Sequence, residues 1–176
     1  MPIRKAFEAI NRSPHKIILY SVAAIIIILT VYYLPNYFFL EKATAEHTAI
    51  LLNSLGVPVQ TRVLNGSVFL DNIKIVKDCT GVQVIAVFLG LIIPVPNAPV
   101  KRKILTLGAV SVLLYGANLV RIGLEFSLVY LNMLPWSLAH YPLSLLLGIP
   151  GVFILVFVAN RLMPEFGNFL FSIRHM

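Results

Sequence analysis

The chain has 176 residues, of which 59% are hydrophobic and only 12% are charged. Soluble domains carry roughly 25% charged residues, so this composition excludes a soluble globular domain, a disordered chain and a coiled coil, and leaves an integral membrane protein. The net charge of +7 does not indicate a nucleic acid partner, because the basic residues lie between apolar segments and form no single patch.

Four apolar segments follow one another along the chain and predict an all-α polytopic membrane protein with about four transmembrane helices. They run from Ile17 to Leu34, Thr80 to Val95, Ile104 to about Tyr130, and about Tyr141 to Val158. The first is longer than the apolar core of a signal peptide and no small-residue cleavage site follows it, so we expect a retained anchor.

Basic residues are unequally divided between the two sides of this predicted bundle, and their excess on one side indicates its orientation. The side with more basic residues carries Arg4, Lys5, Arg12, Lys16, Lys101, Arg102, Lys103, Arg161 and Arg174. Positive charge collects on the cytoplasmic side of membrane proteins. We therefore expect a multi-pass protein of the cell membrane with both termini in the cytoplasm.

The segment 36–78 then lies outside the cell as a small insertion. Its first part, Asn36 to Leu55, is typical of an amphipathic helix, with apolar side chains at Phe39, Leu40, Ala43, Ile50 and Leu51. Its second part, Val57 to Lys77, alternates like two strands around Asn65-Gly66, a strong signal for a β-hairpin. We expect one membrane-embedded domain, 1–176, with this extracytoplasmic insertion and a catalytic transmembrane core at 79–162.

Three of the predicted spans carry a polar or small face at helical spacing. The faces are Cys79, Gln83, Ala86 and Gly90; Ser111, Tyr115, Asn118, Arg121 and Glu125; and His140, Ser144, Gly148 and Gly151. Polar groups inside a membrane usually face the bundle interior, so these faces are expected to pack together, with Gly148 and Gly151 allowing close approach.

Three of these side chains are also predicted at one depth. Cys79 and His140 open their spans at the outer end, and Arg121 lies about 25 Å from the inner end of its own span, at roughly 1.5 Å per residue. A cysteine at the start of a helix is favoured as the nucleophilic thiolate, although the Asp78 carboxylate opposes this. His140 is suited to take the thiol proton, and Arg121 to hold an oxyanion or anchor a substrate carbonyl.

Each residue also has a simpler explanation when it is taken alone. A lone membrane cysteine is usually an inert small hydrophobe. Arg121 is one turn from Glu125 and is placed to form an ion pair with it. His140 is placed to contact lipid headgroups. The coincidence of all three at one depth favours the catalytic interpretation.

The same residues resemble the exosortase and archaeosortase family. The resemblance rests on Asp78-Cys79-Thr80-Gly81, on Asn118-Leu119-Val120-Arg121-Ile122, and on Ala139-His140 ahead of Gly148. It covers roughly residues 76–151. Many exosortases are longer, and some archaeosortases have arginine where His140 stands. The chain therefore resembles the compact members, and archaeosortases in particular.

The resemblance implies a cysteine protease and transpeptidase that cleaves a C-terminal sorting signal from secreted surface proteins and passes them to a lipid or other amine acceptor. It implies Cys79 as nucleophile, Arg121 as electrostatic partner and His140 as acid and base, on the extracytoplasmic side. Asn118, Gln83, Asp78 and Ser144 are expected to bind substrate or support these groups. No motif for a metal or another cofactor is present.

Two other functions remain open at this point. A non-catalytic membrane scaffold or assembly factor would not need the thiol. A small transporter subunit would need polar residues through the whole depth of the bundle, and the inner halves of the second and fourth spans are almost wholly apolar. The absence of an H-E-x-x-H motif argues against a metalloprotease.

Overall fold

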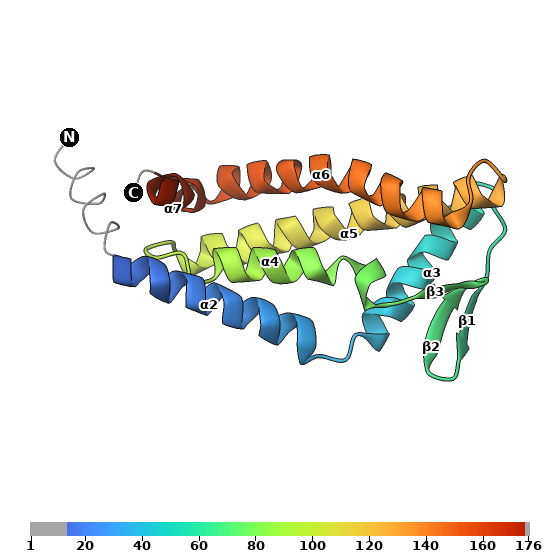
Figure 1. The fold of residues 1–176 in the computed structure, drawn as a ribbon, viewed down its shortest axis with the longest axis horizontal. Coiled ribbons are helices and arrows are strands. Elements are labelled where there is room, and N and C mark those ends of the chain that lie inside the picture. Colours follow the sequence, from blue (N-terminus) through green and yellow to red (C-terminus); the bar gives the residue numbers. More distant parts are fainter. Residues whose placement is uncertain (1–13, 175–176) are drawn as a thin grey trace. The chain divides into compact units, whose positions relative to one another are not determined.

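The structure, a computed structural model, describes residues 14–174. It is mostly helical, with one small antiparallel sheet (Figure 1). In chain order the elements are α2 (Pro14–Tyr33), α3 (Phe38–Ser54), β1 (Thr61–Leu64), β2 (Ser67–Leu70), β3 (Ile73–Ile75), the 3-10 helix η1 (Lys77–Thr80), α4 (Val82–Ile92), α5 (Val100–Tyr130), α6 (Trp136–Leu162) and α7 (Pro164–Arg174). The predicted helical class with a helix and strands in the insertion is confirmed.

Helix length decides which elements are able to cross a bilayer. The 31 residues of α5 extend about 46 Å, well beyond a hydrocarbon core of roughly 30 Å. Within α6, Leu138–Leu162 is also long and apolar enough. The 11 residues of α4 extend only about 16 Å. Within residues 14–174 the helices therefore support two membrane spans, or three if α2 and α3 form one broken span, where four were predicted.

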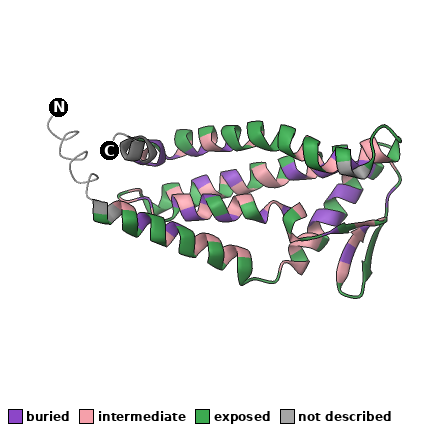
Figure 2. Cartoon of the chain, in the orientation of Figure 1, coloured by how far each residue is buried: buried purple, intermediate pink, exposed green. Residues whose placement is uncertain are grey.

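Apolar side chains are exposed along both α5 and α6, and Figure 2 shows α6 as largely exposed and α5 as a mixture of exposed, intermediate and buried residues. Among those of α6, Leu145, Leu146, Phe153, Ile154 and Phe157 are exposed. Such a surface is stable in lipid and not in water. The chain is therefore a membrane protein. The orientation stays a prediction, and Arg4, Lys5 and Arg12, on which it partly depends, lie outside the described residues, as do the side chains of Lys16 and Arg174.

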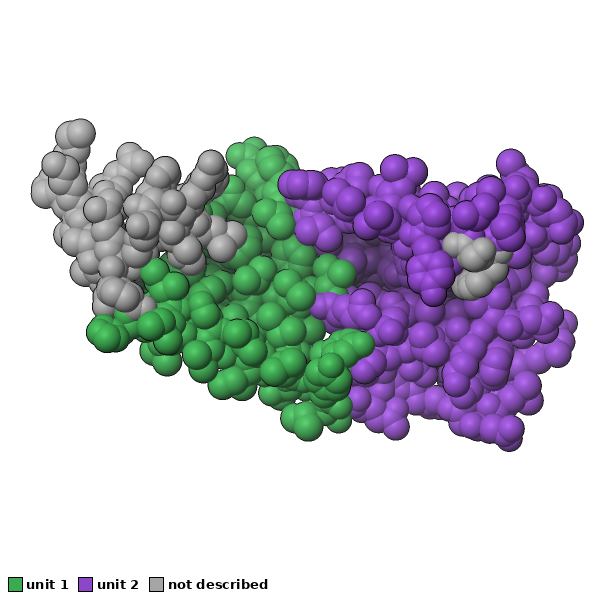
Figure 3. Space-filling view, viewed as in Figure 1, with its two compact units in different colours: residues 1–34, 84–111, 156–176 green, residues 35–83, 112–155 purple. Residues whose placement is uncertain are grey.

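The chain divides into two compact units (Figure 3). Unit 1 takes in Met1–Leu34, Val84–Ser111 and Val156–Met176, and unit 2 takes in Pro35–Gln83 and Val112–Leu155. All the predicted site residues fall in unit 2. The expected division into an insertion, 36–78, and a catalytic core, 79–162, stays a prediction.

In unit 1, α2 packs directly against α4 at Gly90. A Cβ atom at this position would lie 2.5 Å from Cγ1 of Ile28 and 2.7 Å from the backbone oxygen of Ala24. The Tyr20 hydroxyl donates a hydrogen bond of 2.7 Å to the backbone oxygen of Leu91 beside this contact. This contact differs from the expected packing of the Gly90 face on the third and fourth predicted spans, because Gly90 packs on α2, which overlaps the first.

We predict that Gly90→Val destabilises the protein by about 1–3 kcal/mol, because the added carbons would displace the α2 backbone. Thermal unfolding in detergent measures the loss. Gly108→Val in α5 is the matched control, since a Cβ there meets nothing within 4 Å. Equal unfolding temperatures for the two variants would contradict the close contact.

Unit 2 contains a three-stranded antiparallel sheet in the order β1-β2-β3. The predicted hairpin around Asn65-Gly66 is confirmed: Leu64 pairs with Ser67, and both turn residues have positive φ, as a two-residue hairpin turn of type I′ requires. The structure adds a third strand, β3, after a second turn in which Asp71 has a positive φ. This third strand leads directly into η1.

The sheet packs on α3, and α3 packs on α5. The core contains Ala45, Ala49, Leu52, Val59, Val68, Leu70, Ile75, Ile122 and Phe126. Phe39 and Ile50 of the predicted apolar face of α3 are exposed, so these two side chains do not pack in the protein core. The buried face instead has small residues, Thr44, Ala45, Thr48 and Ala49, together with Leu52. Small side chains let α3 lie close to its neighbours on both sides.

Candidate active site

Cys79 lies in η1, the single 3-10 turn that follows β3. Its backbone N–H donates to the oxygen of Val76 at 2.8 Å, and its side chain packs against the core between the sheet and α3. Gly81 follows with φ 76°, a left-handed conformation that ends η1 before α4 begins. The prediction that Cys79 opens an α-helix is therefore wrong, because α4 begins only at Val82.

Asn118 of α5 holds this turn from the other side. Its Nδ2 donates a hydrogen bond of 2.6 Å to the backbone oxygen of Cys79. Within the turn, the Thr80 hydroxyl donates to the oxygen of Lys77 at 2.6 Å. The backbone of Cys79 is thereby fixed by bonds within the turn and by one bond to a membrane helix.

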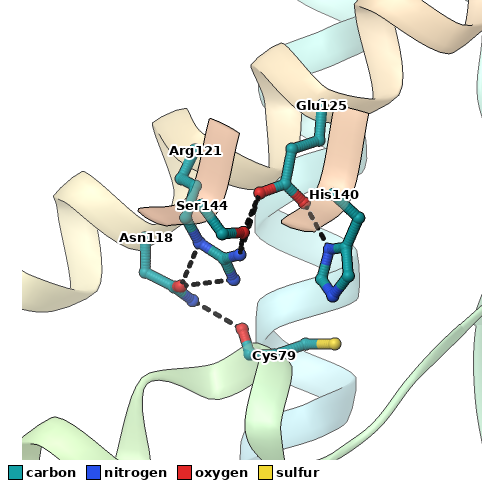
Figure 4. Close-up of polar contacts among 6 residues, drawn as sticks. All are labelled: Cys79, Asn118, Arg121, Glu125, His140 and Ser144. Carbon is teal, nitrogen blue, oxygen red and sulfur yellow. Dashed lines mark hydrogen bonds and ion pairs between the residues drawn. The ribbon is translucent and has the colours of Figure 1, made fainter. Parts of the chain in front are cut away.

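Arg121 lies one turn further along α5 and is bonded on several sides (Figure 4). Its Nε and Nη2 donate to Oδ1 of Asn118 at 3.2 and 3.0 Å. Its Nη1 donates to Oε1 of Glu125 at 2.9 Å and to Oγ of Ser144 at 2.6 Å. These four bonds use four of the five N–H groups of a guanidinium and leave one N–H on Nη2.

Glu125 joins α5 to α6 through both of its carboxylate oxygens. Oε1 accepts from Arg121 and from the hydroxyl of Ser144, the latter at 2.6 Å. Oε2 lies 2.9 Å from Nδ1 of His140. The Glu125 side chain is only 1% exposed, whereas those of Arg121 and His140 are 16% and 27% exposed. The carboxylate is thus the buried centre of the cluster, and the arginine and histidine lie nearer its surface.

Five of the seven predicted site residues therefore come together in one hydrogen-bonded network: Cys79, Asn118, Arg121, His140 and Ser144. In Figure 4 the Cys79 thiol points to the side of the cluster on which the His140 ring lies. The other two residues pair with each other at an exposed position, where Nε2 of Gln83 donates to Oδ1 of Asp78 at 2.6 Å.

Glu125 was not predicted as a site residue. The sequence places it on the same face of α5 as Arg121, and its ion pair with Arg121 was considered only as an alternative to catalysis. The bonds to His140 and Ser144 show that the pair and the cluster are one feature. Gly148 and Gly151, expected to allow close packing, instead have nothing within 4 Å of an added Cβ.

The electrostatic surroundings of Cys79 differ from the expectation of a lowered thiol pKa. Burial is the largest effect and raises the pKa of Cys79. The Val76 backbone and the positive charge of Arg121 lower it, and Glu125 and Asp78 raise it further. The N-terminus of an α-helix does not lower the pKa of Cys79 as expected, since the cysteine lies in a 3-10 turn. These surroundings therefore favour the neutral thiol over the thiolate.

Metal binding has no support in the described part of the chain. Among residues 14–174, no three His, Cys, Asp or Glu side chains are grouped so that they would hold a metal ion. The functional groups that the cluster offers are a thiol, an imidazole and a guanidinium.

The fold and the cluster together define a class: a helical membrane protein in which a cysteine, an arginine and a histidine share one polar network. A family model described as transmembrane exosortase (Exosortase_EpsH) matches residues 12–158, so the chain belongs to the transmembrane exosortase family. This family is in general one of cysteine-type membrane proteases and transpeptidases that process proteins carrying sorting signals. Neither a curated protein nor a solved structure matches the chain.

We predict that the Cys79 thiol titrates above the ordinary value of about 8.5, because burial is the largest influence on its pKa. Arg121→Gln removes a positive charge and should raise the pKa of Cys79 further. Asp78→Asn removes a negative charge and should lower it. The rate of Cys79 alkylation as a function of pH measures all three values.

Glu46→Gln is the control for this series, since Glu46 is an exposed residue of α3 that forms an ion pair of 3.7 Å with Lys42. It should leave the titration unchanged. A wild-type midpoint below 8 would contradict the account of the thiol as buried and neutral.

Proposed function

We propose that this protein cleaves the C-terminal sorting signal of secreted surface proteins with Cys79 as nucleophile, and transfers the cleaved chain to a lipid or other amine acceptor. The single observation that carries the proposal is the network that joins the Cys79 turn to Arg121 and His140 through Asn118, Glu125 and Ser144. Family membership supplies the reaction class, and the network supplies the residues.

The first half of the reaction forms a thioester. Sγ of Cys79 attacks the carbonyl carbon of the scissile peptide while an imidazole nitrogen of His140 takes the thiol proton. The carbon–nitrogen bond then breaks, and the proton passes from His140 to the leaving amine. A neutral resting thiol suits this sequence, because the proton needs to move only when the substrate is in place.

The second half returns the enzyme to its starting state. An incoming amine attacks the thioester carbonyl, gives a proton to His140, and expels Sγ of Cys79, which recovers its proton. Water would compete with the amine at this step, and a site within or beside the membrane limits its access. A new amide bond then joins the acceptor amine to the cleaved chain.

For Arg121 we propose that only part of the guanidinium is available to bind the substrate. Four of its N–H groups are bonded to Asn118, Glu125 and Ser144, so it contributes a fixed positive charge and one remaining N–H on Nη2. That donor is the one we assign to the oxyanion of the tetrahedral intermediate. A guanidinium braced in this way needs no reorientation as charge develops.

The proposed topology follows from the positive-inside rule, with both termini in the cytoplasm and the site on the extracytoplasmic side. It suits the reaction, since a secreted protein presents its sorting signal on that side. Asp78 and Gln83 form an exposed pair beside Cys79, and we assign this pair to contact with the substrate chain.

The alternative is a membrane scaffold or assembly factor without catalysis. For such a protein the thiol would be dispensable. The connection of Cys79 through Asn118 to a buried carboxylate, a guanidinium and an imidazole favours the enzyme, because ionisable groups are costly to bury in a membrane protein and usually mark functional sites.

We predict that Cys79→Ala and His140→Ala each stop removal of the sorting signal in cells, so that the uncleaved precursor accumulates. Cys79→Ala removes the nucleophile, and His140→Ala removes the proton acceptor, a loss of about 10²–10⁴ in rate. Immunoblots of an exported protein with a tagged C-terminal signal measure the ratio of precursor to product.

His15→Ala is the matched control, because His15 is an exposed residue at the start of α2 in unit 1. It should process the precursor at the wild-type rate. Normal processing by Cys79→Ala would favour the scaffold and refute the proposed reaction.

A further inference from the structure

Glu125 has one of the largest fully buried side chains among the described residues, and it ends in a carboxylate. An ionised carboxylate in such a place is stable only when hydrogen bonds and an opposite charge replace its lost hydration. Glu125 has both, and its two oxygens bond to three side chains. Oε1 accepts from Arg121 and Ser144, and Oε2 bonds to His140.

The bond to His140 determines how that ring is protonated. A carboxylate only accepts hydrogen bonds, so the 2.9 Å contact requires a proton on Nδ1 of the imidazole. In a neutral ring the lone pair is then on Nε2, the nitrogen that can act as a base. A ring held with the other tautomer or another orientation would present an N–H in place of that lone pair.

The bonds to Oε1 hold the carboxylate itself in position. Arg121 and Ser144 both donate to it, and Nη1 of Arg121 also donates to the Ser144 hydroxyl. This closed set of three bonds fixes the rotation of the carboxylate, and with it the direction of Oε2 toward His140. The ion pair between Arg121 and Glu125 therefore orients the histidine as well as balancing charge.

We propose that Glu125 is a positioning residue for the reaction: it holds His140 in the tautomer with its lone pair on Nε2, and it acts on Cys79 through His140. This inference rests on the proposed function and adds a fourth functional residue to it. Glu125 does not touch the reacting atoms. Its contribution is that the base is ready before the substrate arrives.

The charge of Glu125 acts on Cys79 in the opposite direction, and this separates the two effects. The charges that shift the pKa of the thiol are those of Arg121 and Glu125 on α5 and of the neighbouring Asp78. His140 on α6 faces Glu125. The negative charge of Glu125 raises the pKa of Cys79. If charge were its only effect, Glu125→Gln would make the thiol react faster at neutral pH. If Glu125 positions His140, the same substitution makes it react more slowly.

The experiment measures alkylation of Cys79 at pH 7 by a small neutral reagent, on the purified full chain in detergent. Cys79 is the single cysteine of the chain, so the label reports one site. We expect Glu125→Gln to slow the reaction roughly tenfold relative to wild type through loss of base assistance. Glu46→Gln is the matched control and should react at the wild-type rate.

A double-mutant cycle then tests whether the effect passes through His140. In the His140→Ala background, Glu125→Gln should cause no further slowing, and the loss of its negative charge should leave the rate equal or slightly higher. Faster alkylation by Glu125→Gln in the wild-type background, or equal slowing in both backgrounds, would overturn the inference.

Glu125→Asp covers the case in which Glu125→Gln fails to fold. Aspartate keeps the negative charge beside Arg121 but is shorter by one methylene group, so it does not reach Nδ1 of His140. We expect alkylation slowed as in Glu125→Gln, in a variant that still unfolds in a cooperative thermal transition. Wild-type reactivity of Glu125→Asp would overturn the inference.

The failure of this inference and the failure of the proposed function give different results. If Cys79→Ala still removes the sorting signal, the proposed function fails whatever the Glu125 variants do. If Cys79→Ala stops processing while Glu125→Gln and Glu125→Asp process and alkylate like wild type, only the role of Glu125 is refuted.

Discussion

A carboxylate that is buried in a membrane protein must be held by donors on every side, and in this chain that requirement joins two membrane helices. Glu125 accepts bonds from Arg121 on its own helix and from Ser144 and His140 on α6. Loss of Arg121 would leave the buried carboxylate without its opposite charge, at a cost of about 3–5 kcal/mol. The positions of the arginine and the histidine within unit 2 both depend on this one side chain.

The placement of Cys79 depends on different forces. The sheet and α3 bury one side of η1, the left-handed Gly81 turns the chain into α4, and Asn118 fixes the backbone oxygen of Cys79. Burial keeps the thiol protonated, so the cluster favours proton transfer during attack over a resting thiolate. This differs from cysteines at helix N-termini, where the helix itself stabilises the anion.

Much of the site could be predicted from the sequence, because helical spacing places Asn118, Arg121 and Glu125 on one face and His140 and Ser144 on another. The hairpin turn at Asn65-Gly66 could also be predicted from the sequence. Spacing does not show which side chains meet across two helices, so the bonds of Glu125 to α6 were missed. Hydrophobicity did not show that Gly81 ends η1 and shortens the second span, or that α3 buries its threonines and alanines in place of Phe39 and Ile50. Those outcomes depend on local backbone conformation and on tertiary packing.

The most direct test of the account is the isolation of the thioester between Cys79 and the new C-terminus of a cleaved substrate. Mass spectrometry of the enzyme, purified from cells in which the acceptor is depleted, would identify the adduct, and the single cysteine assigns it without ambiguity. The account predicts a substrate fragment on Cys79 that neutral hydroxylamine releases. Processing that continues with no adduct on Cys79, and that also continues in Cys79→Ala cells, would contradict it.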